Sequence, residues 1–414
     1  MLGSGTNRRA GMTFIFITLV IDILGIGIIV PILPELIKIL LDGDVTRAGY
    51  YYGVIIAVYA LMQFLFAPVV GALSDRFGRR PIILLSLLGL GADYLIQAWA
   101  PSVEWLFVGR LIAGIMGASL TAANAYIADV STPETRARNY GLAGVAFGLG
   151  FIFGPALGGL LGGINLRLPF IVAALLSLIN LIYGFFVLPE SLPAERRSSV
   201  SWQKLNPLSS ILRLRNYPLV AGLSVTVIFT SLAQRGLESV WVLYTGYRYG
   251  WNEQTNGLTL ALVGLMAVIV QGLILKPVIA KIGERRTIVL GLTASMLALL
   301  GYGMASEGWI VLIIIIVGSL SGIALPTIQS LVAGSVNQSE QGAVQGALTS
   351  LVSLTSVLAP LIFTAGLFSF FTSDRAPFVL PGAPFYLGSF LVLISLIMLK
   401  RTFRTLPSGS FRDA

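Results

Sequence analysis

The sequence predicts an all-α membrane protein in which twelve transmembrane helices form two pseudo-symmetric bundles of six. Three observations predict this fold. Of the 414 residues, 56% are hydrophobic and only 11% are charged, against roughly 25% charged in soluble domains. The apolar residues form twelve long runs, and glycines and prolines recur at one spacing in both halves of the chain. Lipid must surround such a chain, and its backbone polar groups must be satisfied within helices.

Each apolar run is long enough to cross a bilayer as a helix, which takes about 20 residues. The runs do not alternate between polar and apolar residues, as the strands of a membrane barrel would. No small-residue cleavage site follows the N-terminal MLGSGTNRRAG, so we expect a first membrane helix there and not a removed signal. The runs lie near residues 12–38, 48–73, 82–99, 103–129, 137–163, 168–188, 218–247, 255–281, 287–305, 309–335, 341–371 and 380–400.

The placement of the basic residues predicts the orientation. The formal net charge of +9 alone would suggest an acidic partner such as nucleic acid. With both termini in the cytoplasm, however, 20 of the 27 basic residues lie in the termini or the cytoplasmic loops, and five lie in outer loops. That asymmetry is the positive-inside pattern. It predicts a multi-pass protein of the bacterial inner membrane with both termini cytoplasmic and no nucleic-acid partner.

A polar connection over residues 189–216 separates the two predicted bundles, which occupy residues 1–188 and 217–414. Parallel six-helix halves with a site between them near the middle of the membrane are a known transporter architecture. A shift of 205 residues superimposes four glycine or proline positions from separate helix pairs, which indicates an internal duplication. It maps Gly78 onto Gly283, Gly117 onto Gly322, Gly141 onto Gly346 and Pro155 onto Pro360.

Five ionisable residues inside the apolar runs are the candidates for proton coupling. A charge at the centre of a membrane helix costs about 2.5 to 3.5 kcal/mol, so each should face a partner or a water-filled cavity. The chain has no histidine and no cysteine, so proton chemistry must use other side chains, and neither a disulfide nor a cysteine-ligated metal site can form. The five are Asp22, Asp93, Arg110, Arg235 and Glu238.

Each candidate also has a structural interpretation. Burial favours the neutral form of a carboxylic acid, so Asp22 could exchange protons, or it could pack against helix ends or hold a cation. Asp93 and Arg110 lie on neighbouring helices and could form a structural ion pair. Arg235 and Glu238 are three residues apart on one helical face and could neutralise each other.

Polar and aromatic residues mark a candidate substrate cavity. Trp241 and Tyr244 extend the face of Glu238, which would suit an amphipathic organic substrate; an aromatic belt or a helix contact is the alternative. No nucleotide-binding loop, metal cluster or nucleophile with its base is evident, so neither a cofactor nor an enzymatic activity is expected. Further candidate cavity residues are Gln63, Asn124, Gln234 and Gln329.

The loop GALSDRFGRRP, residues 71–81, is the most specific motif in the chain. Its glycines permit a tight turn, its acid can cap or pair at a helix end, and its arginines hold the turn at the cytoplasmic face. The weaker copy AKIGERR, residues 280–286, lacks the acid. We expect an ion-pair latch between the loop and the inner ends of helices four and five. It would comprise Gly71, Asp75, Arg76, Gly78, Arg79, Arg80, Asp129, Glu134, Arg136 and Arg138.

The fifth predicted helix contains GFIFGPALGGLLGG. Glycines spaced four apart clear one helix face for close backbone contact, and the proline bends the helix. The segment therefore predicts a flexed, tightly packed gate built on Gly150, Gly154, Pro155, Gly158, Gly159 and Gly162.

These motifs resemble those of the major facilitator superfamily and, within it, the drug/proton antiporters. Asp22 with its following glycines and prolines is similar to the first-helix motif of that group, GALSDRFGRRP to its signature loop, GRLIAG to its fourth-helix motif and GFIFGPALGG to its fifth-helix antiporter motif. Stretches such as AYIADVSTPETRAR look closest to the tetracycline exporters. The resemblance implies that Asp22 and Asp93 serve proton coupling with Arg110, and that Asp75 and Arg79 belong to a gating loop.

The second half departs from the tetracycline exporters, with Ser295 in place of an acid in helix nine, Ala267 in place of a histidine in helix eight, and an unusual Arg235 and Glu238 in helix seven. The resemblance implies a monomeric proton-coupled antiporter that exports a small amphipathic molecule, tetracycline-like or another drug, by alternating access. Two alternatives are proton-coupled uptake of a nutrient or siderophore, and a membrane receptor or scaffold that transports nothing.

Overall fold

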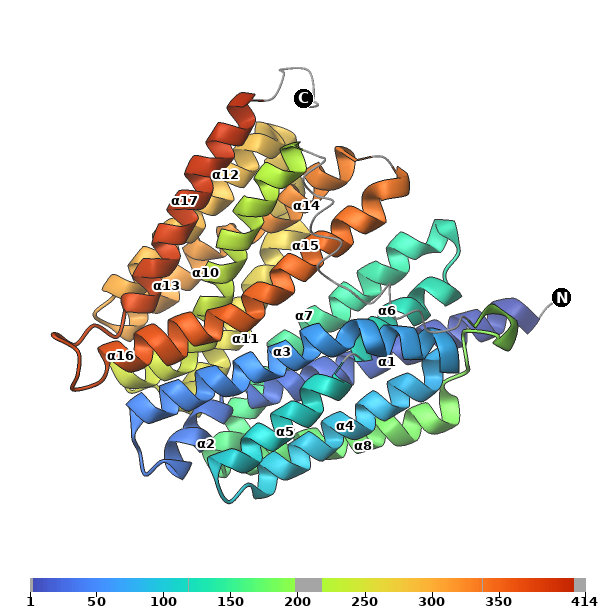
Figure 1. Ribbon diagram of the computed structural model, residues 1–414, viewed down its shortest axis with the longest axis horizontal. Coiled ribbons are helices and arrows are strands. Elements are labelled where there is room, and N and C mark those ends of the chain that lie inside the picture. The colour runs from blue at the N-terminus through green and yellow to red at the C-terminus, as the bar shows by residue number, and fades with distance from the viewer. Residues whose placement is uncertain (1–2, 118, 198–217, 337, 406–414) are drawn as a thin grey trace. The chain divides into compact units, whose positions relative to one another are not determined.

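The computed structural model describes residues 3–117, 119–197, 218–336 and 338–405, and every regular element in these ranges is helical (Figure 1). Backbone contacts divide the chain into two compact units. Unit 1 comprises Met1–Gly43, Val58–Leu205 and Asn252–Ala261, and unit 2 comprises Asp44–Ala57, Asn206–Trp251 and Leu262–Ala414. The start of the second long helix therefore counts with unit 2, and a short segment after residue 251 counts with unit 1.

In unit 1, α1 packs against α7 and α8, and α4 packs against α8 and α5. A turn at residues 30–32 divides the first predicted span, because Pro31 cannot donate a helical hydrogen bond. The elements that contribute to this unit are α1 (Gly3–Ile29), α2 (Leu33–Leu40), most of α3 (Val45–Phe77), α4 (Arg79–Trp99), α5 (Val103–Met116), α6 (Ser119–Val130), α7 (Pro133–Ile164), α8 (Leu168–Val187) and the short 3₁₀ helix η1 (Ala194–Arg196).

In unit 2, α10 packs against α17 and α15, and α12 packs along α17. The π-helical segment η6 begins at Pro360, where the missing N–H breaks the regular ladder. The elements that contribute to this unit are the start of α3, α10 (Pro218–Tyr249), the second half of α11 (Glu253–Ile269), η4 (Val270–Ile274), α12 (Leu275–Met304), α13 (Gly308–Gly318), η5 (Ser319–Ile323), α14 (Ala324–Gly334), α15 (Gln338–Ala359), η6 (Pro360–Phe368), α16 (Ser369–Phe371) and α17 (Ala383–Thr405).

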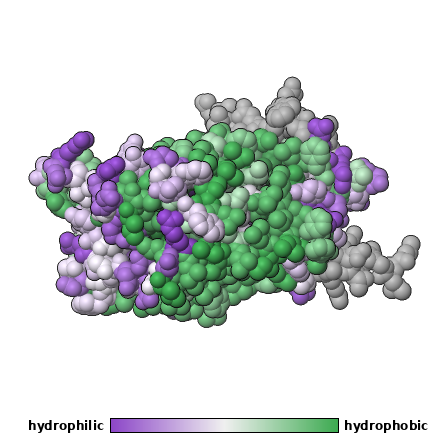
Figure 2. All heavy atoms as spheres, turned by 90° about the horizontal axis from the view of Figure 1, so that it is seen from below, coloured by the Kyte–Doolittle hydropathy of each residue, from purple (hydrophilic) through white to green (hydrophobic). Residues whose placement is uncertain are grey.

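The helices account for all twelve predicted spans. Ten helical stretches in the described residues are long and apolar enough to cross a membrane. One of them, Glu253–Met304, changes direction at Gly283, where φ is +76°, and so provides two spans. The 32-residue α10, which carries charged residues in its middle, provides another. Figure 2 shows a face on which hydrophobic residues cover the middle and hydrophilic residues gather mainly toward the two ends.

The backbone conformation of the two halves repeats at the glycine positions that the sequence offset pairs. Gly78 and Gly283, 205 residues apart, both have positive φ, +104° and +76°, a conformation that favours glycine. The helix of span four ends near Gly117, and span ten changes to the 3₁₀ segment η5 around the equivalent Gly322. The two bundles are therefore pseudo-symmetric, as predicted.

Candidate functional site

A cluster of buried polar side chains lies within unit 1, on helices α1, α3, α4 and α5. The structure brings Asp93 and Arg110 together as an ion pair, with 2.8 Å between Asp93 Oδ2 and Arg110 Nη2. Asp93 is completely buried, and Arg110 is 8% exposed. Gly109 permits this approach, because a methyl group at that position would lie 2.6 Å from Asp93 Oδ1. The first glycine of GRLIAG, on α5, thus makes room for the Asp93 carboxylate on the neighbouring helix α4.

Tyr59 of α3 extends this pair toward Gln63. The Arg110 guanidinium lies 5.4 Å from the centre of the Tyr59 ring, within the range of a cation–π contact. Gln63 Nε2 donates a hydrogen bond to the Tyr59 hydroxyl at 2.8 Å and lies 3.4 Å from the Gly117 carbonyl oxygen. Sequence reasoning singled out Gln63 but missed Tyr59, because one more aromatic residue in an apolar helix gives no signal by itself.

Asp22 of α1 is also buried, with 7% of its surface exposed. One turn further along α1, Gly25 lies beside the ring of Tyr94, with which a methyl group at this position would make ordinary contact at 3.5 Å. Asp22, Asp93 and Arg110 all act electrostatically on Tyr94 and so belong to one region. A carboxylate in this region changes the local charge by one unit when it binds or releases a proton. The cluster can therefore change its charge by binding one proton.

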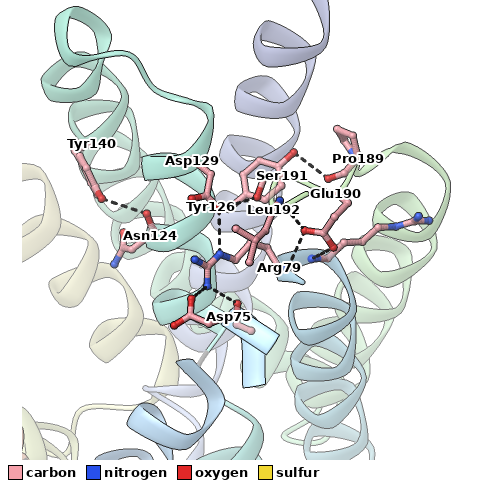
Figure 3. A network of polar contacts seen from close by, with 12 residues as sticks. Asp75, Arg79, Asn124, Tyr126, Asp129, Tyr140, Pro189, Glu190, Ser191 and Leu192 are labelled. Carbon is pink, nitrogen blue, oxygen red and sulfur yellow. Dashed lines mark hydrogen bonds and ion pairs between the residues drawn. The ribbon is translucent and has the colours of Figure 1, made fainter. Parts of the chain in front are cut away.

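A second polar network lies where α3, α4, α6 and the segment after α8 meet (Figure 3). Its centre is Arg79, whose Nη1 lies 2.5 Å from Asp75 Oδ1 and 3.0 Å from Ser74 Oγ. Arg79 Nε donates to Asp129 Oδ2 at 3.0 Å, and Ser191 Oγ donates to the same oxygen at 3.0 Å. One arginine thus ties together three helices and the chain that leaves the sixth span.

Glu190 completes this network by capping α4. Its carboxylate accepts hydrogen bonds from the backbone N–H groups of Arg79, at 2.8 Å, and Arg80, at 3.3 Å, which are the first two residues of the helix. A carboxylate here satisfies free N–H groups and complements the helix dipole. A side chain at Gly78 would collide with the Glu190 carboxyl group, so this turn needs glycine for space as well as for its positive φ.

The structure includes only some of the predicted latch residues in this network. Asp75, Arg79 and Asp129 meet, while the guanidinium of Arg76 lies 5.1 Å from the centre of the Phe77 ring. Arg80 donates to the Phe185 carbonyl oxygen, and a methyl group at Gly71 would make ordinary contact with Thr121. In the first turns of α7, the side chains of Glu134, Arg136 and Arg138 are exposed and take no part in the ion pairs of Arg79.

The glycines of α7 form two different contacts within unit 1. Gly150, Gly154 and Gly158 face α1, where an added methyl group would collide with Ile23, Gly27 and Ile28 respectively. The adjacent face of the helix carries Pro155 and Gly159, which lie against the backbone of residues 253–257 at the start of α11. The motif therefore serves close packing on both faces, and Gly162 lies beside Ile32.

In unit 2, Arg235 and Glu238 of α10 form an ion pair of 2.7 Å. Gln234 Nε2 donates to the other Glu238 oxygen at 3.2 Å. The two charged side chains are 46% and 48% exposed in the middle of a membrane-length helix. Because a charge in contact with lipid is costly, we expect this exposed turn to face water.

Trp241 and Tyr244 were predicted to extend this exposed surface, but the structure buries both. Trp241 packs edge-on against Tyr302, with 5.2 Å between ring centres. Tyr244 packs edge-on against Phe385 and donates to the Tyr302 carbonyl oxygen at 2.7 Å. These aromatic residues therefore hold α10 to α12 and α17, and Tyr244 also lines a pocket of about 280 Å³ with Arg248 and Tyr386.

Two further cavity candidates are Asn124 in unit 1 and Gln329 in unit 2. The backbone carbonyl of Asn124 accepts a hydrogen bond of 3.2 Å from the Tyr140 hydroxyl, and the Asn124 amide points away from the Arg79 network (Figure 3). Gln329 is exposed on α14.

Comparison with known proteins places the chain in context. It matches the family described as Major Facilitator Superfamily over residues 15–360. It is 39% identical over 384 residues to the class C tetracycline resistance protein of Escherichia coli, covering 93% of this chain and 95% of that protein. It is 36% identical over 386 residues to the class G protein of Vibrio anguillarum, covering 93% and 96%. Among solved structures it is similar to the human organic anion transporter MFSD10, with 25% identity and a TM-score of 0.68 over 95% of this chain and 99% of that one.

Proposed function

Because the chain belongs to the Major Facilitator Superfamily, we propose that it is an antiporter that exports a small amphipathic molecule across the inner membrane in exchange for protons. Its similarity to tetracycline resistance proteins over nearly its whole length makes a tetracycline-like drug the first substrate to test. The observation that carries the proposal is the buried cluster of Asp22, Asp93 and Arg110, since ionisable side chains within membrane helices are costly and mostly mark ion or substrate pathways.

The proposed cycle is alternating access, in which each opening of the protein exposes the cluster to one side of the membrane. Asp22 is the principal proton carrier. The Asp93–Arg110 ion pair contributes to the electrostatic surroundings in which Asp22 binds and releases its proton. Release of the proton inward leaves a negative cluster, which favours entry of an amphipathic or cationic substrate. Uptake of a proton from outside removes that charge and favours substrate release.

We assign substrate contact in the second half to the exposed turn of α10. Gln234, Arg235 and Glu238 combine an amide, a cation and an acid on one water-facing surface. Glu238 is our second candidate for proton coupling. This turn is also a departure from tetracycline exporters, so it is where the substrate range of this protein would differ.

The Arg79 network is assigned the role of a latch. Asp75 and Asp129 hold Arg79 from two helices, and Glu190 holds the start of α4. Breaking these contacts would release one conformation of the transporter. The assignment places the network and both termini on the cytoplasmic side, and the protein acts as a monomer without an enzymatic step.

Transport in everted membrane vesicles tests the proposal. In such vesicles the cytoplasmic face points outward, so an antiporter should accumulate labelled tetracycline when the vesicle interior is acidic, and a protonophore should abolish the accumulation. Vesicles without the protein are the control. Proton-driven accumulation in right-side-out vesicles alone would instead indicate uptake. A drug-susceptibility panel in an exporter-deficient host would extend the test to other amphipathic drugs.

A further inference from the structure

Tyr94 of α4 carries a buried hydroxyl group that packing does not explain. Its side chain is 1% exposed, and its hydroxyl makes no hydrogen bond with the described residues. Tyr126 and Tyr244 are buried as deeply, and both of their hydroxyls donate to backbone carbonyl groups, at 3.2 and 2.7 Å. A buried hydroxyl without a partner costs about 1 to 3 kcal/mol, so packing alone would favour phenylalanine at position 94.

The hydroxyl of Tyr94 lies against α1. A methyl group added at Gly25 would lie 3.5 Å from the hydroxyl oxygen. Gly25 follows Asp22 by three residues, so both lie on the same side of the helix. The hydroxyl therefore reaches the side of α1 that carries the Asp22 carboxylate, which agrees with the electrostatic effect of Asp22 on Tyr94. The other ionisable side chains that act on Tyr94 are Asp93, Arg110 and Tyr59.

Gln97 is a second buried polar residue on this stretch of α4. It has no exposed surface, and its Oε1 atom accepts no hydrogen bond from the part of the chain that the structure describes. Its side chain interacts with that of Asp93, one turn earlier. Successive residues of a helix differ by about 100° in direction, so Gln97 points between Asp93 and Tyr94, about 40° from the first and about 60° from the second.

One internal water molecule would satisfy the polar groups on this turn of α4. Arg110 holds Oδ2 of Asp93, while Oδ1 has no hydrogen bond to any residue that the structure describes. A buried water typically makes about three hydrogen bonds to groups that would otherwise be unsatisfied. It can donate to Asp93 Oδ1 and to Gln97 Oε1 and accept from the Tyr94 hydroxyl.

We propose that one water molecule binds beside Gln97 and that, with the Tyr94 hydroxyl, it relays protons between the two carboxylates of the cluster. The inference rests on the proposed proton coupling and adds a route to it. The proton of the Asp93 carboxylic acid passes to the water, the water gives one of its own to the Tyr94 oxygen, and the phenolic proton passes to the Asp22 carboxylate. Each O–H bond that breaks is matched by one that forms, so the water and the hydroxyl are restored and one proton has moved. The reverse steps return it.

Transport by Tyr94→Phe in everted vesicles tests the relay, because this change removes only the hydroxyl. We expect the initial rate of labelled tetracycline uptake driven by an acidic interior to fall about a hundredfold, as for the loss of a positioned proton-transfer group. Exchange of labelled for unlabelled tetracycline without a gradient needs no proton transfer between the carboxylates and should be unchanged. The control is Tyr183→Phe on α8 of the same unit, whose ring stacks on Phe14; it should change neither rate.

Two further variants separate the relay from a structural role. Because its hydroxyl has no partner among the described residues, Tyr94→Phe should keep or raise the melting temperature. Tyr126→Phe breaks a hydrogen bond of the folded protein and should lower it. Gln97→Met keeps the volume of the side chain and removes a partner of the water, so it should slow gradient-driven uptake and spare exchange.

Infrared spectroscopy of the purified protein after a pH jump needs no substrate. The carboxylic acid bands, assigned with Asp22→Asn and Asp93→Asn, should change at one common rate in wild type and at two rates in Tyr94→Phe. One common rate in Tyr94→Phe, normal gradient-driven uptake, an equal loss of uptake and exchange, or a melting temperature lowered as in Tyr126→Phe would overturn the relay. Absence of proton-driven uptake by wild type would instead contradict the proposed function, and the infrared rates would then decide the relay alone.

Discussion

Asp93 and Arg110 form a buried ion pair, 2.8 Å between Oδ2 and Nη2, in which the carboxylate has no exposed surface. Such a pair is costly to form, and it is much more costly to break by removing one partner, because the other charge is then left uncompensated. Asp93 and Arg110 therefore cannot be varied independently. Removal of either partner alone would lower the stability of unit 1.

Arg110→Gln is expected to destabilise the protein by about 3 to 5 kcal/mol, because Asp93 stays buried without its counter-charge. Thermal unfolding in detergent measures the loss. The double variant Asp93→Asn with Arg110→Gln should recover most of the stability, since both charges are gone, and yet remain inactive in proton-driven transport. A double variant as unstable as the worse single variant would show that the two charges do not compensate each other.

Asp22→Asn should keep the fold and abolish gradient-driven export. The amide is close in shape to the carboxylate but cannot release a proton, so substrate binding should survive and only coupling should fail. Everted vesicles measure the coupling, and substrate-induced quenching of tryptophan fluorescence measures the binding. Normal gradient-driven export by this variant would make Asp22 structural and place coupling elsewhere.

Glu190→Gln tests the carboxylate that caps α4. It removes the negative charge from two hydrogen bonds with backbone N–H groups, so we expect a loss of about 1 to 2 kcal/mol in the free energy of unfolding. Glu195→Gln, in the exposed helix η1 of the same segment, is the matched control. Equal thermal stability of the two variants would contradict the capping role.

Asp75→Asn should slow turnover without abolishing substrate binding, because Arg79 would keep Asp129 but lose its partner on α3. Glu134→Gln, which removes an acid from the exposed first turn of α7, should leave turnover within about twofold of wild type, as expected for exposed charges. Initial rates in everted vesicles at saturating drug concentration compare the two. Unchanged turnover in Asp75→Asn would remove the latch from the proposed mechanism.

Gly158→Val should destabilise unit 1 strongly, because the new side chain would collide with the Ile28 backbone of α1. Overpacking of this kind usually costs about 1 to 3 kcal/mol, and more where backbone must move. Gly141→Val on the same helix meets no atom of the described residues within 4 Å and serves as the control. The melting temperatures of the two variants should therefore differ, and equal values would refute the close packing.

Much of the fold could be predicted because each membrane span needs its own run of apolar residues. All twelve runs coincide with helices, and the offset that pairs Gly78 with Gly283 recurs as a backbone conformation. The Asp93–Arg110 pair could be anticipated because a charge within the membrane has few possible partners. The ion pair between Asp75 and Arg79 could be anticipated because both residues lie in one motif, four positions apart.

The contacts that the sequence did not predict depend on neighbours far away in the chain. Glu190 lies more than a hundred residues after Arg79, and an acid that follows a helix does not reveal which helix start it will cap. Trp241 lies only about 20° around the helix from Gln234, yet it is buried because Tyr302 covers that turn. Helical periodicity gives the direction of a side chain but not what covers it.

The exposure of the side chains changes abruptly along α10, and this has a consequence for how such a protein adapts. Gln234, Arg235 and Glu238 are exposed, while residues one or two turns later hold the helix in place. Selection by a new drug can therefore alter the polar turn while the anchoring aromatic residues stay unchanged. A population under antibiotic pressure would be expected to accumulate changes at these three positions first.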